Sequence, residues 1–247
     1  MTVEILHPQW DAPPSVRAVC TLRSGGVSVA PFANLNLGSH AGDDPTSVAE
    51  NRRRVRLELA LPSEPSWLQQ VHGTQVFDVD TDTAAALIAD AAVTRSADRV
   101  LAIQVADCMP VLFASDDGAV IAAAHAGWRG LAAGVLEAAT AAMNVEPGTL
   151  HVWLGPAISA EHFEVGDDVR AEFMAHDECA ALAFQRNARG RWQCDLTLLA
   201  RQRLAAMGIS QISVANLCTY EQDDQCFSYR RDGRTGRMAA LIWRAGG

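Results

Sequence analysis

The segment from Val105 to Gly130 constrains the fold most, because it combines a hairpin pattern with two residue types that bind metals. Two apolar runs flank Ser115-Asp116-Asp117-Gly118, which is a typical turn sequence. The centre of that turn falls between Asp116 and Asp117, so a symmetric hairpin places Cys108 directly opposite His125. Directly opposed residues lie about 4.5 to 5.5 Å apart, close enough for a thiolate and an imidazole to bind one ion at about 2.3 and 2.0 Å. The alternative is a buried cysteine and a hydrogen-bonded histidine in a sheet.

A metal site needs a third ligand, and His72 is the best candidate because it also ends a predicted strand at a glycine. His40, in a long loop rich in Asn, Gly and Asp, is the next candidate. Two histidines and one cysteine with a fourth position open to water are typical of a catalytic zinc site. The same residues can hold copper with an axial methionine, but successive strand side chains point to opposite faces, which places Met109 poorly for that role. The sequence therefore favours zinc over copper.

The cysteine and the histidine also fit a second chemistry, in which an imidazole activates Cys108 as a nucleophilic thiolate. Asp107 is a candidate to orient a ligating imidazole or to act as a general base, and a turn residue at a strand end is an equal interpretation. Arg129, Arg230 and Arg231 are candidates to bind a phosphate bidentately, although each alone also fits ordinary surface charge. These five residues form the predicted catalytic set.

The net charge of −9 and the pI near 5.2 argue against a broad nucleic-acid surface. No apolar run approaches the roughly 20 residues of a membrane span, and the first residues do not resemble a signal peptide. We therefore expect a cytoplasmic protein that acts on small molecules, with no membrane or nucleic-acid partner. The six cysteines form no C-x-x-C pair, which gives no evidence for disulfides in an intracellular chain. The sequence does not define the oligomeric state.

The rest of the chain interleaves predicted strands and helices over one globular unit, residues 1–247. Strands are expected at 16–22, 67–72, 75–79, 99–105, 151–154, 212–218 and 237–243, and helices at 45–60, 131–143, 165–176 and 195–207. We expect 67–72 and 75–79 to pair as a hairpin and Pro110 to lie at a sheet edge or bulge. The Ala-rich stretch 82–92 is open between helix and strand. The pattern indicates an α/β or α+β fold with mixed sheets.

Several motifs follow one another in order over nearly the whole chain. The most specific are Gln70-Val71-His72-Gly73, Ala106 to Leu112, His125 to Gly130, Gly155 to Ile158 and Phe227 to Arg237, and the match also takes in Thr21 to Gly26, Asn34 to Gly38 and Gly42 to Arg53. Together they resemble the YfiH family of bacterial proteins, also called the polyphenol oxidase or laccase-domain family, which includes the peptidoglycan editing factor. One departure is Ser159-Ala160-Glu161-His162, where many members have cysteines.

The resemblance implies a single-domain α+β fold with α/β/β/α layers and a zinc ion bound by His72, Cys108 and His125. The implied activity is purine nucleoside phosphorolysis, in which adenosine, inosine or methylthioadenosine and phosphate give the free base and ribose 1-phosphate. Adenosine deaminase and laccase-like phenol oxidase activities are also attached to the family. Members are further linked to removal of a wrong amino acid from muramyl precursors.

Our leading hypothesis is therefore a zinc-dependent purine nucleoside phosphorylase with adenosine deaminase as a side activity. The alternatives are a Cys108-dependent hydrolase that edits amino-acid-substituted muramyl nucleotides, a laccase-like phenol oxidase, and a metal-stabilised binding protein without catalysis. Seven histidines with no His-x-His pair argue against several copper sites. The combined H-x-E and P-C-x-x-C signature of zinc deaminases is absent, so deamination needs another acid or base.

Overall fold

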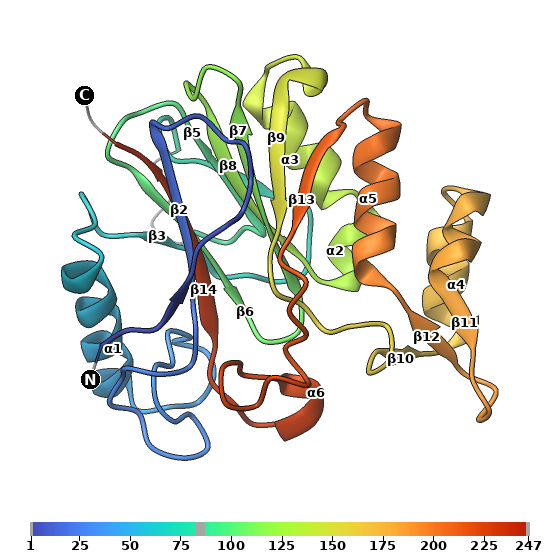
Figure 1. Ribbon diagram of the computed structural model, residues 1–247, viewed down its shortest axis with the longest axis horizontal. Coiled ribbons are helices and arrows are strands. Elements are labelled where there is room, and N and C mark those ends of the chain that lie inside the picture. The colour runs from blue at the N-terminus through green and yellow to red at the C-terminus, as the bar shows by residue number, and fades with distance from the viewer. Residues whose placement is uncertain (1, 83–86, 246–247) are drawn as a thin grey trace.

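Two sheets pack face to face and carry helices on both outer faces (Figure 1). The structure is a computed structural model that describes residues 2–82 and 87–245. In the five-stranded sheet the order is β1 (Ile5–Leu6), β2 (Val16–Thr21), β14 (Met238–Arg244), β6 (Val100–Val105) and β3 (Ser66–Trp67). In the six-stranded sheet the order is β13 (Gln211–Val214), β9 (Leu150–Leu154), β7 (Met109–Ser115), β8 (Ile121–Ala126), β5 (Ala91–Thr94) and β4 (Val76–Asp78). Both sheets contain parallel and antiparallel pairs.

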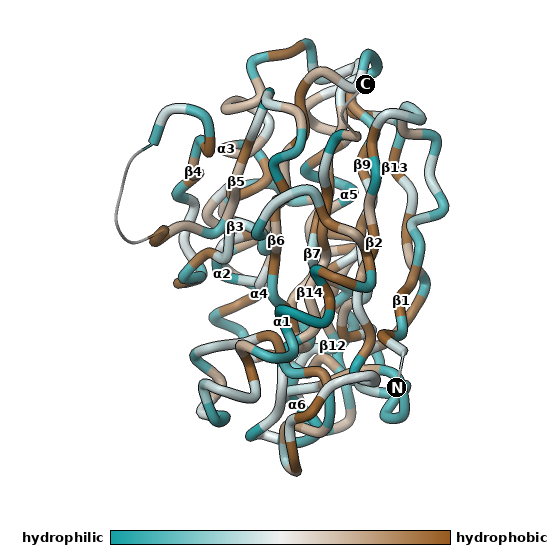
Figure 2. The backbone as a smooth tube through the Cα atoms, turned by 90° about the vertical axis from the view of Figure 1, so that its left-hand side faces the viewer, coloured by the Kyte–Doolittle hydropathy of each residue, from teal (hydrophilic) through white to brown (hydrophobic). Residues whose placement is uncertain are grey.

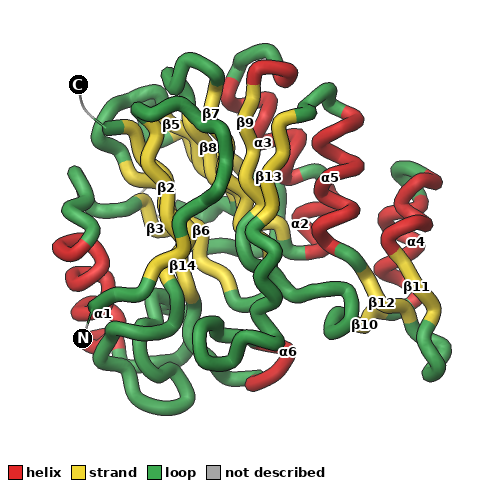
Figure 3. Tube along the Cα trace, viewed as in Figure 1, coloured by secondary structure: helices red, strands yellow, loops and turns green. Residues whose placement is uncertain are grey.

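The helices are α1 (Pro45–Glu58), α2 (Trp128–Ala133), α3 (Val135–Met143), α4 (Asp167–Met174), α5 (Leu196–Ala206) and the short α6 (Tyr229–Asp232), with 3-10 turns at Pro147–Thr149 and Glu178–Ala183. The outer layers are formed by α1 on the five-stranded sheet and by α2, α3 and α5 on the six-stranded sheet, while α4 and α6 lie outside these layers (Figure 1). A small third sheet of β10 (Glu164–Val165), β12 (Trp192–Cys194) and β11 (Phe184–Arg186) lies with α4 at one side of the molecule (Figure 3). No helix among the described residues is long and apolar enough to cross a membrane.

An inner strand contributes side chains to two buried layers, because successive residues of a strand face opposite sides of its sheet. On β7, Leu112 packs between the two sheets while Val111 packs under the helices. On β14, Ala240 lies between the sheets while Leu241 packs with Val55 of α1. Hydrophobic residues are accordingly concentrated along the strands of both sheets (Figure 2). The α+β prediction with mixed sheets in α/β/β/α layers is confirmed.

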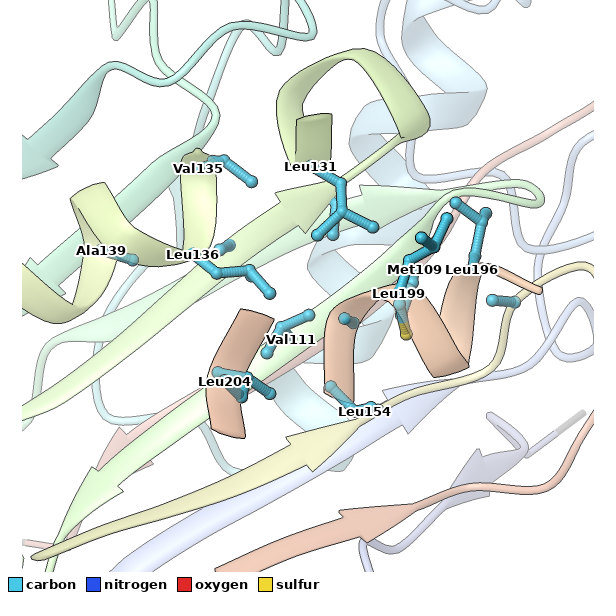
Figure 4. Close-up of a cluster of buried hydrophobic side chains, with 14 of the residues drawn as sticks. Met109, Val111, Leu131, Val135, Leu136, Ala139, Leu154, Leu196, Leu199 and Leu204 are labelled. Carbon is cyan, nitrogen blue, oxygen red and sulfur yellow. The ribbon is translucent and has the colours of Figure 1, made fainter. Parts of the chain in front are cut away.

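The largest of the three clusters of buried hydrophobic residues lies between the six-stranded sheet and the helices that cover it. Val111 and Leu154 from the sheet lie against Leu136 of α3 and Leu204 of α5, and Met109 lies near the start of α5 (Figure 4). This packing holds α2 and α3 directly behind β8, the strand that carries His125. The predicted helix 131–143 is in fact two helices, since Gly134 adopts a left-handed conformation with φ of 101° between them.

The β7–β8 hairpin forms, but the predicted register is wrong. His125 lies opposite Pro110, and Cys108 lies just before the first residue of β7. The reason is that the four-residue loop 116–119, closed by the bond from Ser115 N to Val120 O, is centred between Asp117 and Gly118, one residue beyond the predicted centre between Asp116 and Asp117. The two registers differ by two residues, so Cys108 stays on the same face as Pro110 and remains a diagonal neighbour of His125.

Two further expectations about strands are corrected. Pro110 does not lie at a sheet edge, because β7 is an inner strand between β9 and β8. Its missing N–H is tolerated because β9 pairs with β7 only from Val111 onwards. The segments 67–72 and 75–79 do not form a hairpin: Trp67 pairs with Ala102 in one sheet, and Val76 pairs with Ala91 in the other. The chain between them crosses from sheet to sheet. Of the open stretch 82–92, residues 83–86 lie outside the described residues.

Candidate metal centre and active site

Three side chains from separate parts of the chain meet at one end of the sheets. His72 comes from the crossing between β3 and β4, Cys108 from the residue before β7, and His125 from β8. Their ligand atoms all lie within 4.8 Å of one another, and in the described part of the chain they form the one such group of three or more His, Cys, Asp or Glu residues. Cys108 Sγ is 3.8 Å from His72 Nε2. The structure therefore brings together the three predicted ligands.

The geometry fits a small tetrahedral ion. Zinc bonds of about 2.3 Å to sulfur and 2.0–2.1 Å to nitrogen place the two ligand atoms about 3.6 Å apart, close to the distance between Cys108 and His72. Gly127, in the turn after β8, packs against this group, and a Cβ there would lie 2.8 Å from His72 Cδ2 and 2.9 Å from Cys108 Sγ. Only glycine allows the turn to approach so closely. His40 lines the neighbouring cavity but is outside the three-residue group.

Asp90 orients this group, although no motif in the sequence points to it. Its fully buried carboxylate accepts hydrogen bonds from His125 Nδ1 at 2.8 Å and from the backbone N–H groups of Val71, His72 and Gly73 at 3.1, 2.9 and 2.7 Å. A bond at Nδ1 leaves His125 Nε2 free for a metal. His72 has a left-handed φ of 62°, a conformation that a non-glycine residue adopts only when its surroundings impose it.

The site is strongly polarised. Burial alone would raise the pKa of the Cys108 thiol, but the imidazoles of His125 and His72 outweigh burial and lower that pKa to about 6. Burial alone would lower the pKa of His125, but the Cys108 thiolate and the Asp90 carboxylate raise it to about 9. At neutral pH the metal-free protein therefore holds a thiolate beside an imidazolium, which suits either a metal ligand or a nucleophile.

A cavity of about 550 Å³ opens onto the three ligands. Its cationic lining consists of Arg129, Arg230 and Arg237, and its aromatic lining of Trp128, Phe163 and Tyr229. Each of these arginines lies over one of these rings, with guanidinium carbons 4.3 Å from the Trp128 centroid, 5.2 Å from the Phe163 centroid and 5.9 Å from the Tyr229 centroid. Among the described residues none of the three forms an ion pair with a carboxylate, so their charge is available to an anionic ligand.

The arginines that line the cavity differ in one member from the three predicted to bind phosphate. Arg129 and Arg230 line the cavity as expected, but Arg231 is absent from its lining. The Arg231 guanidinium pairs with Asp232 at 2.8 Å and donates to three backbone carbonyls, those of Thr219, Tyr220 and Cys226. It braces the preceding loop, and we do not include it in a phosphate site. Arg237 lines the cavity instead. In the sequence it is the last residue of a motif and the first of a predicted strand, but it was not predicted as a site residue.

Asp107 lines the cavity but does not contact an imidazole. Its Oδ1 accepts from Thr219 Oγ1 at 2.7 Å and its Oδ2 accepts from Arg230 N at 2.6 Å. The orienting role that we considered for Asp107 is performed for His125 by Asp90.

The fold and the site define a layered α+β protein with a His-Cys-His metal-binding group at the end of a cation-lined cavity. Residues 17–245 match the family model described as multi-copper polyphenol oxidoreductase laccase, and the chain belongs to this family. The YfiH assignment made from motifs is confirmed. The chain is 47% identical over 240 residues to the Escherichia coli (strain K12) protein named purine nucleoside phosphorylase YfiH, covering 97% of this chain and 98% of the relative.

Other relatives agree. The chain is 49% identical over 239 residues to the Pseudomonas aeruginosa protein named purine nucleoside phosphorylase PA4543, covering 96% of this chain and 97% of the relative. Among solved structures, Neisseria meningitidis protein NMB0706 superposes with a TM-score of 0.94 at 44% identity, covering 98% of this chain and 99% of that one. YlmD from Geobacillus stearothermophilus gives a TM-score of 0.85 at 31% identity, covering 98% and 100%.

Proposed function

We propose that this chain is a zinc-dependent purine nucleoside phosphorylase that acts on adenosine, inosine or methylthioadenosine. The observation that carries the proposal is the single cavity that joins the His72, Cys108 and His125 group to three arginines without carboxylate partners. Phosphorolysis needs an anionic nucleophile held beside a group that stabilises charge as the base departs. The names of the relatives from Escherichia coli and Pseudomonas aeruginosa support the same reaction.

In the proposed reaction, Arg129, Arg230 and Arg237 bind inorganic phosphate and orient one of its oxygens toward ribose C1′. The aromatic rings beneath these arginines restrict their motion and offer apolar faces to the nucleoside. The new bond joins the phosphate oxygen to C1′ while the bond from C1′ to purine N9 breaks. The electron pair of that bond leaves with the purine, and the proton that hydrogen phosphate gives up on forming the ester balances the one that the purine takes up. Zinc held by His72, Cys108 and His125 would supply Lewis-acid stabilisation.

The test is a phosphate-dependence assay on zinc-loaded protein. Adenosine and phosphate should give adenine and ribose 1-phosphate in equal amounts, and omission of phosphate should stop the release of adenine. The proposal is refuted if zinc-loaded protein with saturating phosphate releases no base from any of the three nucleosides. These bases are adenine from adenosine, hypoxanthine from inosine and adenine from methylthioadenosine. Formation of inosine from adenosine without phosphate measures the proposed deaminase side activity separately.

The second candidate is the Cys108-dependent hydrolase acting on amino-acid-substituted muramyl nucleotides. It is favoured by the lowered pKa of Cys108 beside two imidazoles, since a thiolate attacks acyl carbons without a metal. Cys108→Ala is expected to abolish both activities and does not separate them. Full activity after removal of zinc would favour the hydrolase. The laccase-like alternative finds no second group of three such ligands in the described part of the chain, whereas multicopper oxidation needs several copper sites.

A further inference from the structure

We infer that Asp107 is a positioning residue that fixes the backbone of Arg230, and with it the arginine that faces the cavity. This inference rests on the proposed function, because it assigns Asp107 to phosphate binding. Asp107 makes three hydrogen bonds to three different segments. Its carboxylate accepts from Thr219 Oγ1 at 2.7 Å and from Arg230 N at 2.6 Å, and its backbone oxygen accepts from Ile158 N at 3.0 Å.

Asp107 itself is buried, and its backbone conformation is strained. Asp107 is 8% exposed and Thr219 is fully buried. Asp107 also has a left-handed φ of 92°, which costs energy for a non-glycine residue and persists only where its surroundings impose it. Because Cys108 follows directly, the same backbone conformation sets where the sulfur lies. Asp107 therefore links the metal-ligand segment to the arginine segment.

Thr219 is itself held in place by the neighbouring chain. Its N–H donates to Ala157 O at 3.1 Å, and its carbonyl accepts from Arg231 Nη1 at 2.9 Å. This explains why Arg231 lies outside the cavity: it braces the threonine that donates to Asp107. The two carboxylate oxygens of Asp107 are each occupied by a donor, so the geometry favours a fixed acceptor over a general base.

Arg230 is consequently anchored at both ends. Asp107 holds its backbone N–H, while its Nη1 donates to Glu164 O at 2.9 Å and its guanidinium lies over the Phe163 ring. If the backbone end shifts, the guanidinium must leave either the carbonyl of Glu164 or its position in the cavity. Loss of the Asp107 contact is therefore expected to weaken phosphate binding more than the chemical step.

Thr219 provides the cleanest test, because it touches neither the metal group nor the cavity. Thr219→Val keeps the shape but removes the hydroxyl donor, and Thr219→Ser keeps the donor. We expect Thr219→Val to raise the KM for phosphate by about tenfold, the lower end of the cost of losing an orienting partner, with a smaller change in kcat. Thr219→Ser should stay close to wild type, and zinc content should be unchanged in both.

Two measurements without turnover accompany the kinetics. Amide hydrogen exchange at Arg230 should become faster in Thr219→Val and remain slow in Thr219→Ser, and calorimetry with inorganic phosphate should show weaker binding only to the valine variant. Asp107→Gly is the second variant should the valine protein unfold; glycine adopts the φ of 92° freely but leaves Thr219 Oγ1 and Arg230 N without their acceptor, so the same losses are expected. Equal phosphate affinity and equal Arg230 exchange in Thr219→Val and Thr219→Ser would overturn the inference. A wild-type protein that binds phosphate but cleaves no nucleoside would instead refute the proposed reaction.

Discussion

Substitution of Asp90 by asparagine tests whether the metal group depends on its orienting carboxylate. Asp90 Oδ1 accepts from His125 Nδ1 at 2.8 Å and from His72 N at 2.9 Å, while Oδ2 accepts from Gly73 N at 2.7 Å and Val71 N at 3.1 Å. An asparagine keeps one oxygen and presents an NH2 group to two N–H donors that then lack an acceptor. Loss of such a partner lowers metal affinity by about 10- to 100-fold, which corresponds to about 1.4 to 2.7 kcal/mol.

The assay is a competition titration of zinc between the protein and a chromophoric chelator at neutral pH. Asp80→Asn is the matched control, since Asp80 accepts from Thr94 Oγ1 and Arg95 N at the opposite end of β5 and touches none of the ligands. Thermal unfolding of both variants separates a general loss of stability from a local effect. Equal zinc affinity in wild type, Asp90→Asn and Asp80→Asn would refute the orienting role of Asp90.

Gly127→Ala is expected to lower zinc affinity and to destabilise the fold by about 1 to 3 kcal/mol, because the added methyl would lie 2.9 Å from Cys108 Sγ. Zinc content measures the first effect and thermal unfolding the second. A variant that binds zinc fully and unfolds at the wild-type temperature contradicts this prediction. Zinc binding near neutral pH should release about one proton, because Cys108 is already ionised above a pKa of about 6 while His125 keeps its proton up to about 9. The affinity should therefore rise with pH across that interval, and calorimetry in buffers of different ionisation enthalpy counts the protons; a count near zero would show that the pair is not ionised in this way. Arg237→Gln should raise the KM for phosphate by about tenfold or more, whereas Arg189→Gln, an arginine outside the cavity that pairs with Glu164, should leave it unchanged in steady-state assays at varied phosphate.

Local patterns predicted most elements of this fold, because those patterns report on neighbouring residues. Helices were predicted at 45–60 and 195–207 and form as α1 and α5; Asp44 and Asp195 cap them, each with a side chain that accepts from a backbone N–H three residues later. Apolar, β-branched runs on either side of a turn sequence likewise predicted the strands around Cys108 and His125. The hairpin register was missed because the bonds of Ser115 to Asp117 and Val120 decide where the loop begins and ends, and a turn composition does not reveal those bonds.

Contacts between distant segments explain the remaining errors at the site. Asp90 precedes a strand in an Ala-rich stretch, and nothing near it in the sequence indicates that its carboxylate reaches residues 71–73 and His125. The choice between Arg231 and Arg237 is similar. Both belong to one basic segment and both donate to backbone carbonyls, and only the folded chain shows that Arg237 lines the cavity while Arg231 does not.

The two candidate reactions make incompatible demands on one sulfur atom. A thiolate that ligates zinc shares its electron pair with the ion and is a weaker nucleophile, so Cys108 cannot serve both roles in the same molecule. A cysteine nucleophile needs one activating imidazole, and His125, fixed by Asp90, already provides it. The second imidazole is then unexplained, although the chain holds His72 in a left-handed conformation through a run of amides bonded to Asp90. Strain of about 1 to 3 kcal/mol is retained where it has a use. Completing a three-ligand metal site gives His72 that use, which is why we rank the metal-dependent phosphorylase above the cysteine hydrolase.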